Sequence, residues 1–126
     1  MKIIEQEEVR KLLQPKDCIQ LMAEALKGLE SGEYAQPARL ITVMPNTAKF
    51  GFMPAYVGDY FGAKVISAFA PNMGTKYPSH IGYVMLFESA HSTVAGMIEA
   101  GSITEIRTGA CLLYTSPSPR DGLLSR

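Results

Sequence analysis

The sequence lacks the features that mark several large classes of protein. Its two cysteines, Cys18 and Cys111, form neither a disulfide framework nor a zinc-type cluster with histidine. No apolar run approaches the roughly 20 residues that span a bilayer, and residues 1–5 are too acidic for a secretion signal. These absences predict a soluble, cytoplasmic protein with no metal site and no membrane partner.

Net charge and glycine-rich turns are also missing. The chain has 12 basic and 12 acidic residues, so it carries no bulk field that would attract nucleic acid or anionic lipid. Its glycines never form the Gly-x-Gly fingerprint of a phosphate-cradling turn. We therefore predict no nucleic-acid partner and no cofactor-binding residue in this chain.

The sequence does contain enough apolar material for one core. Hydrophobic residues make up 47% of the 126 residues, a length that suits a single domain. Helical spacing over residues 9–13 predicts a short helix that ends before Pro15. A second helix is predicted with Asp17 as its N-cap and Gly32 at its C-terminal end. Its predicted apolar face comprises Ile19, Met22, Ala23, Leu26 and Leu29.

From residue 39 the pattern changes to short β-type runs. Turn residues separate these runs, and most breaks are short enough to favour antiparallel neighbours. Pro54 lies inside one run and cannot donate to a ladder, which predicts an edge strand or a bend; residues 70–80 are predicted to form a loop. The predicted strands are residues 39–44, 50–56, 61–69, 81–87 and 93–98. The predicted fold class is therefore α/β (α+β), with N-terminal helices packed on a mainly antiparallel sheet.

A third helix is predicted after the last strand. Ser102 and Glu105 have the spacing of a capping box, with Ser102 at the N-cap and Glu105 at N3. Arg107 is then expected in the first two turns of this helix.

The last residues, 111–126, differ from the rest of the chain. Two prolines interrupt the helical pattern, and residues 111–121 can be encoded by a DNA string that resembles the adapter of transposase-based sequencing libraries. We therefore predict that residues 111–126 are a non-native tail and exclude them from fold reasoning. The alternative is a genuine Ser/Pro-rich linker.

Three cations, Arg39, Lys64 and Arg107, stand out by their positions. Lys64 lies in an apolar strand, where a buried ammonium needs a partner, and a guanidinium such as Arg39 can bind a carboxylate through two parallel hydrogen bonds. Arg107 gains nothing from a helix N-terminus. The alternative for each is an ordinary surface cation or an internal salt-bridge partner, and this alternative is stronger for Arg39 and weaker for Lys64. Ser79 and His80 could lie at a pocket rim, but nothing completes a hydrolytic triad.

These segments together resemble the ornithine cyclodeaminase/μ-crystallin family over nearly all of residues 1–110. The matching pieces follow one another in the family's order, and together they are more specific than any one alone. They are Gln36-Pro37-Ala38-Arg39, Phe52-Met53-Pro54-Ala55-Tyr56, Gly62-Ala63-Lys64-Val65, Tyr77-Pro78-Ser79-His80 with Gly82, and Ile103-Thr104-Glu105-Ile106-Arg107-Thr108.

The resemblance implies a two-domain, homodimeric enzyme. Residues 1–110 correspond to its substrate-binding and dimerisation domain, whereas a Rossmann domain that holds NAD or NADP is missing here. It implies that Lys64 is catalytic and shares the grip on the substrate carboxylate with two arginines. The implied carboxylate-binding residues are Arg39, Lys64 and Arg107, and the implied pocket residues are Met53, Ser79, His80 and Thr108.

The resemblance also implies a chemistry. An ornithine cyclodeaminase converts L-ornithine to L-proline and ammonia by hydride transfer to and from NAD. Alanine dehydrogenases, ketimine or pyrroline-2-carboxylate reductases and a small-ligand-binding μ-crystallin without turnover share the family and stay as alternatives. Without the cofactor domain, the fragment is predicted to be inactive and to aggregate through its uncovered surfaces. A stand-alone dimerisation module is the rival interpretation, and it requires a natural tail.

Overall fold

The computed structural model of the chain describes the backbone of residues 1–115 and the side chains of residues 1–109. Three α-helices and six strands make up this part of the chain, with a short 3-10 turn at Ala70–Asn72. In chain order they are β1 (Lys2–Ile4), α1 (Gln6–Leu12), α2 (Pro15–Ser31), β2 (Leu40–Val43), β3 (Lys49–Tyr56), β4 (Tyr60–Ala68), β5 (His80–Glu88), β6 (Val94–Glu99) and α3 (Ala100–Thr115).

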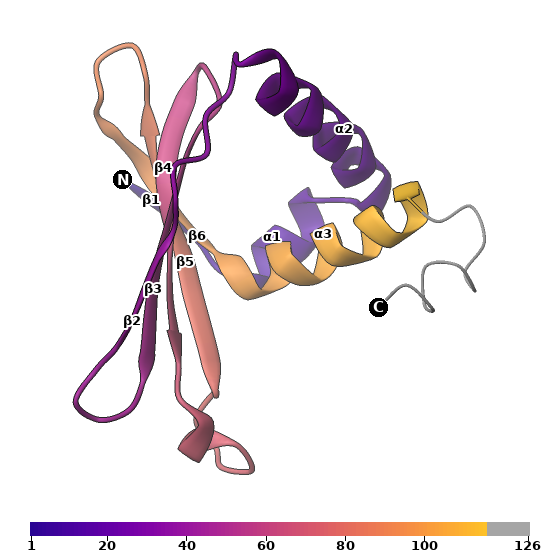
Figure 1. The fold of residues 1–126 in the computed structure, drawn as a ribbon. Helices are drawn as coiled ribbons and strands as arrows, with labels where there is room; N and C mark the ends of the chain where they lie inside the picture. The colour runs from indigo at the N-terminus through magenta and orange to yellow at the C-terminus, as the bar shows by residue number, and fades with distance from the viewer. Residues whose placement is uncertain (116–126) are drawn as a thin grey trace.

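The strands form one sheet in the order β1-β6-β5-β4-β3-β2. From β2 to β6 each strand pairs antiparallel with the next one along the chain, whereas β1 pairs parallel with β6. The three α-helices lie on one side of this sheet, with α1 and α3 nearer to it and α2 packed mainly on α3 (Figure 1). The predicted fold class, α/β (α+β) with a mainly antiparallel sheet, is confirmed.

All five predicted strands are present, with ends shifted only slightly. The strand that the sequence did not reveal is β1, which adds to the edge of the sheet through register pairs such as Ile3 with Met97. A strand of three residues is too short to show an alternating pattern. Its position next to β6 depends on a contact between the two ends of the domain.

Of the two alternatives predicted from Pro54, an edge strand or a bend, the edge strand is wrong, because β3 lies between β2 and β4. Pro54 pairs in register with Ala63 of β4. On the other side of β3, the ladder with β2 ends where Phe52 meets Leu40, and the next pairing is the bridge between Tyr56 and Ala35. Pro54 falls between these two pairings, so the N–H that proline lacks does not remove a hydrogen bond from the sheet.

Helix α2 begins earlier than predicted. Pro15 occupies the first turn and Gln14 is the N-cap, so Asp17 is a first-turn acid rather than the cap. Proline suits this position because the first N–H groups of a helix have no intrahelical partner. The predicted C-terminal end is confirmed, since Gly32 has a left-handed φ of 86°.

The apolar face of α2 is rotated relative to the prediction. Cys18 and Gly28 are its buried residues, whereas Leu26 and Leu29 are 48% and 39% exposed. Gly28 is buried because the ring of Tyr34 lies where a Cβ would project. The inner face of α2 therefore combines these small buried residues with the predicted Ile19, Met22 and Ala23, which are half-buried, while Leu26 and Leu29 fall outside it.

Helix α3 follows β6 without a loop. It begins at Ala100, so the predicted N-cap, Ser102, is already inside it, and Arg107 lies further from the N-terminus than expected. The predicted capping box is wrong for this reason. The helix runs to Thr115, into the segment predicted to be a foreign tail; residues 116–126 of that tail lie outside the described residues.

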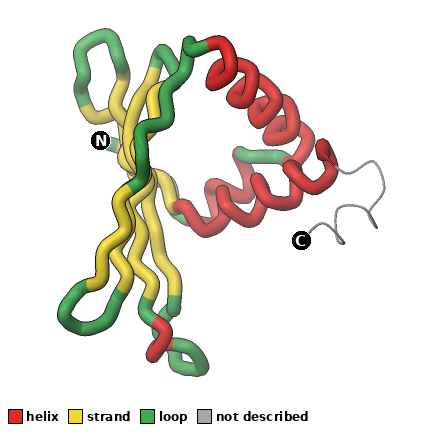
Figure 2. The backbone as a smooth tube through the Cα atoms, in the orientation of Figure 1, coloured by secondary structure: helices red, strands yellow, loops and turns green. Residues whose placement is uncertain are grey.

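The two faces of the sheet differ in what covers them. Lys64 on β4, with its register partners Met53 and Val84, belongs to the face on the side of the helices. Within residues 1–115, no helix covers the opposite face (Figure 2). Large apolar side chains, each more than two-fifths exposed, lie on this open face: Ile3, Leu40, Phe50, Phe52, Tyr56 and Ile81.

Among the described residues, no helix is both long and apolar enough to cross a membrane.

Candidate functional site

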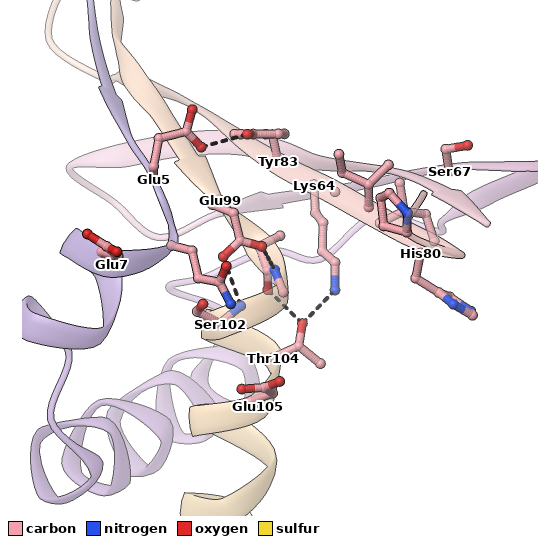
Figure 3. Close-up of a pocket in the computed structure, with 17 residues that line it drawn as sticks. Glu5, Glu7, Lys64, Ser67, His80, Tyr83, Glu99, Ser102, Thr104 and Glu105 are labelled. Atoms are coloured by element: carbon pink, nitrogen blue, oxygen red, sulfur yellow. Dashed lines mark hydrogen bonds between the residues drawn. The ribbon is translucent and has the colours of Figure 1, made fainter. Parts of the chain in front are cut away.

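A cavity of about 850 Å³ lies where the sheet meets the start of α3. Its walls come from β4, β5, the end of β6 and the first turns of α1 and α3, and they include Lys64, His80 and Thr104. Figure 3 shows Lys64 reaching from the sheet toward Thr104 on α3. The cavity therefore brings together side chains that are far apart in the sequence.

Lys64, on β4, is a cation that lines this cavity. Its Nζ donates a hydrogen bond to Thr104 Oγ1 at 3.1 Å, and the side chain is half-buried. Burial lowers the pKa of Lys64, and the positive charge of Arg107 lowers it further. Among the described side chains Lys64 forms no salt bridge. The site thus holds an ammonium that lacks a compensating anion.

Ser79 and His80 lie together at the start of β5. Ser79 Oγ and His80 Nδ1 are 3.1 Å apart. His80 is exposed and lines the cavity, but Ser79 is not among its lining residues. The structure therefore places His80 at the cavity and Ser79 next to it, and their part in a binding site stays a prediction.

The N-terminus of α3 is capped by a carboxylate. Glu99, the last residue of β6, accepts hydrogen bonds from the backbone N–H of Gly101 and, at 3.1 Å, of Ser102. Partial burial opposes ionisation of Glu99, but these hydrogen bonds and the charge of Arg10 outweigh it and lower its pKa. The buried Ser102 hydroxyl meets no acceptor within hydrogen-bond geometry among the described residues, but it lies by the Glu99 carboxylate and also helps to lower the pKa of Glu99.

Two further acids near the cavity also have partners. Tyr83 Oη donates to Glu5 Oε1 at 2.7 Å, and this hydrogen bond is the main reason that the pKa of Tyr83 is raised. Arg10 on α1 pairs with Glu105 on α3 at 3.0 Å. These two carboxylates therefore join elements of the domain to one another. Neither of them pairs with the ammonium of Lys64.

The other residues implied by the family resemblance are more dispersed. Met53 lies opposite Lys64 in the sheet and lines a second, apolar cavity of about 200 Å³ that Lys64 also borders. Arg39 is exposed in the segment before β2, and Arg107 and Thr108 are exposed on α3. None of these last three lines either cavity. Of the two arginines, only Arg107 acts on Lys64, through its charge.

Sequence reasoning missed Thr104 and Glu99. Thr104 Oγ1 donates to the carbonyl oxygen of Ala100 at 3.0 Å, which is a common bond for a threonine one turn into a helix. Knowing that α3 starts at Ala100 would have suggested this bond. Nothing in the sequence indicated that the same hydroxyl meets Lys64, since the two residues lie 40 positions apart.

The described residues do not fit the NAD that the family resemblance implies. A helix N-terminus directly after a strand is a common site for a pyrophosphate, and the junction of β6 and α3 has this arrangement. There, however, the Glu99 carboxylate already occupies the free N–H groups and would repel a phosphate. No Gly-x-Gly turn offers another place, and no group of metal ligands occurs among the described residues.

Solved structures with the same fold include a dehydrogenase, a reductase and a probable cyclodeaminase. An archaeal alanine dehydrogenase dimer with bound NAD superposes with a TM-score of 0.83 at 22% identity, over 89% of this chain and 35% of that one. The Thermococcus litoralis Δ1-pyrroline-2-carboxylate reductase in complex with NADH and L-proline gives 0.81 at 25% identity, over 88% and 35%. A probable ornithine cyclodeaminase from Bordetella pertussis Tohama I gives 0.76 at 22% identity, over 88% and 34%.

The chain therefore spans about a third of the length of these proteins. No curated protein matches the sequence. The model of the ornithine cyclodeaminase/mu-crystallin family matches residues 1–112. With this match, the shared fold and the order of its motifs, the chain belongs to the ornithine cyclodeaminase/μ-crystallin family.

Proposed function

We propose that this chain is the substrate-binding and dimerisation part of an NAD(P)-dependent enzyme that acts on an amino or imino acid, and that Lys64 binds the substrate carboxylate. The leading candidate activity is an ornithine cyclodeaminase that converts L-ornithine to L-proline and ammonia. Alanine dehydrogenase and ketimine or pyrroline-2-carboxylate reductase are the alternatives within the same class.

The observation that carries this proposal is the half-buried ammonium of Lys64 beside a cavity of about 850 Å³, where the described side chains provide no counter-ion. Burying a charge without a partner is unfavourable, and Arg107 adds a like charge that makes it more so. A bound carboxylate relieves both effects at once. Strain of this kind is typical of sites that bind an anion in function rather than of residues that stabilise a fold.

Arg107 and Arg39 complete the proposed carboxylate grip. The charge of Arg107 lowers the pKa of Lys64, and this electrostatic link supports including Arg107 in the grip. Arg39 is exposed just before β2 and has no such link, so its part in the grip is the less supported of the two. Met53 and His80 are proposed to line the pocket, and Ser79 and Thr108 to lie beside it.

The cofactor is proposed to be NAD or NADP, bound by residues outside this chain. It would supply hydride transfer, and three similar solved structures contain bound NAD or NADH. The part assigned to this chain is limited to what its own residues can do. Lys64 holds the carboxylate at the sheet, and the walls of the cavity orient the rest of the molecule.

Dimerisation is assigned to the open face of the sheet. Exposed apolar patches of this extent are typical of protein interfaces, and the face carries Phe50 and Phe52 at 43% and 45% exposure beside a stacked pair of rings, Phe61 and Phe87. A second copy would cover these side chains while leaving the helix side and its cavity free. The archaeal alanine dehydrogenase is described as a dimer.

Protection of Lys64 from an amine-reactive reagent tests the proposal on the 126-residue chain. Each lysine's labelling rate is measured by mass spectrometry without ligand and with L-ornithine, L-proline or L-alanine. We expect at least one of these acids to slow the labelling of Lys64 while exposed Lys49 is unaffected. Equal rates for Lys64 under all conditions would contradict carboxylate binding.

A pair of variants separates binding at Lys64 from a general effect. A hydrogen bond to a charged group contributes about 1.5–3 kcal/mol, so K64M is expected to weaken binding by roughly 10- to 100-fold. K49M makes the same change at an exposed lysine and should bind as the wild type does. Binding without turnover in the longer protein, assayed with NAD and L-ornithine, would favour the ligand-binding μ-crystallin alternative.

A further inference from the structure

Thr104 has a hydroxyl whose hydrogen atom is already committed. Its Oγ1 donates to the carbonyl oxygen of Ala100 at 3.0 Å. A hydroxyl has one hydrogen, so the oxygen can meet Lys64 Nζ only as an acceptor. The Lys64 contact, 3.1 Å long, therefore has a fixed direction, from the ammonium to the threonine.

This acceptor differs in kind from a carboxylate. An aspartate or glutamate at position 104 would neutralise Lys64 and compete with an anionic ligand, whereas a hydroxyl leaves the full charge in place. The ammonium also keeps hydrogens free to bind a ligand. The neighbouring acid, Glu105, is turned to Arg10 instead.

We propose that Thr104 is a positioning residue: it anchors Lys64 to α3 through a neutral acceptor, so that the ammonium is held toward the cavity with its charge uncompensated. The role given to this contact rests on the proposed function, whereas the experiment that tests the contact needs no ligand. Thr104 is hydrogen-bonded to Ala100 in the first turn of α3. The position of the Lys64 ammonium therefore depends on where α3 begins after β6.

The surroundings of Lys64 determine how its titration responds. Besides Lys64, the charged and titratable groups that line the cavity are Glu5, Glu7, His80, Tyr83, Glu99 and Glu105, and Arg107 lies further along α3. Among the described side chains, burial lowers the pKa of Lys64 most, and the charge of Arg107 lowers it further. An acceptor for the ammonium favours its charged form, so removing the hydroxyl should lower the pKa of Lys64 further.

Competitive labelling of the lysines over a pH series tests this in the 126-residue chain without any ligand. T104V keeps the shape of the side chain and removes the hydroxyl. We expect Lys64 in T104V to titrate at lower pH than in the wild type, and therefore to label several-fold faster near neutral pH. T104S, which retains the hydroxyl, should restore the wild-type profile, and Lys49 should be unchanged throughout.

A purely structural role for Thr104 would alter stability without moving the titration of Lys64. An unchanged or upward-shifted titration of Lys64 in folded T104V would overturn the proposal. If circular dichroism shows that T104V is unfolded, T104A replaces it, since alanine favours the helix, and the same two outcomes apply. Failure of the amino acids to protect Lys64 would contradict the proposed function but not this contact.

Discussion

Glu99 caps the helix that follows its own strand: its carboxylate accepts the backbone N–H of Ser102 at 3.1 Å. The same carboxylate takes the N–H of Gly101. The last residue of β6 therefore fixes the direction in which α3 leaves the sheet, and with it the position of Thr104 beside Lys64.

Replacing Glu99 should destabilise the fold through this cap. Loss of a side-chain cap typically costs about 0.5–2 kcal/mol, and we expect E99A to lower the free energy of unfolding by roughly 1 kcal/mol. Urea unfolding followed by circular dichroism measures it. E105A removes an exposed ion pair with Arg10 and serves as the control, because such pairs contribute about 0–1 kcal/mol. A loss in E99A no larger than in E105A would contradict the cap.

The cap also predicts a pH dependence. The pKa of Glu99 is lower in the folded chain than its ordinary value of 4.5, so the folded state binds fewer protons than the unfolded state in this range. The stabilisation by Glu99 is therefore present above the unfolded pKa and is lost as pH falls through the folded pKa. The difference in unfolding free energy between wild type and E99Q should shrink on acidification; a difference independent of pH would contradict this.

Unlike the ionised Glu99, the charged form of Lys64 should destabilise the folded chain. Its pKa in the folded chain lies below the ordinary value of 10.5, so near neutral pH the folded state bears the cost of a partly buried charge. As pH rises through the folded pKa toward the unfolded value, the folded chain releases its proton first and stability increases. K64M should therefore be more stable than the wild type near neutral pH while losing ligand binding.

Thermal unfolding of wild type, K64M and K49M across the alkaline range measures this effect. The advantage of K64M should diminish as pH approaches 10.5, and K49M should resemble the wild type. If K64M were less stable near neutral pH, Lys64 would be a structural residue, and the argument for an uncompensated charge would fail.

The open face of the sheet predicts a specific interface. Phe52 lies on this face and Val43, 63% exposed, lies on the opposite one, because Val43 pairs with Lys49 and Lys49 with Ala68. Sedimentation should show the wild type and V43E as dimers or larger species and F52E shifted toward the monomer. A monomeric wild type, or an F52E that associates unchanged, would contradict the assignment.

Local patterns in the sequence were sufficient to predict most of the fold. Alternation and turn residues revealed five of the six strands, and Gly32 marked the end of α2. The three-residue β1 and the interior position of β3 depend on pairings with distant segments, which local periodicity does not encode. Ser102 matched a capping pattern, but Glu99 is nearer to the actual start of α3 and takes the N–H groups instead.

The candidate site was predictable where a residue conflicts with its surroundings. Lys64 is a cation in an apolar strand, and this conflict was visible in the sequence alone. Thr104 is an ordinary helical threonine, whose meeting with Lys64 results from the packing of α3 on the sheet. Arg39, Arg107 and Thr108 were grouped with Lys64 by family resemblance, yet none lines the cavity; a carboxylate grip including them remains a prediction.

The central claim is that this chain forms part of a longer, NAD(P)-dependent enzyme. Amplifying and sequencing the source DNA past the codon for Ala110 tests it most directly. The account predicts that the reading frame continues into a strand followed by a Gly-x-Gly-x-x-Gly turn, the dinucleotide-binding fingerprint. A frame that truly ends in Leu124-Ser125-Arg126 would contradict it and would support a stand-alone binding module instead.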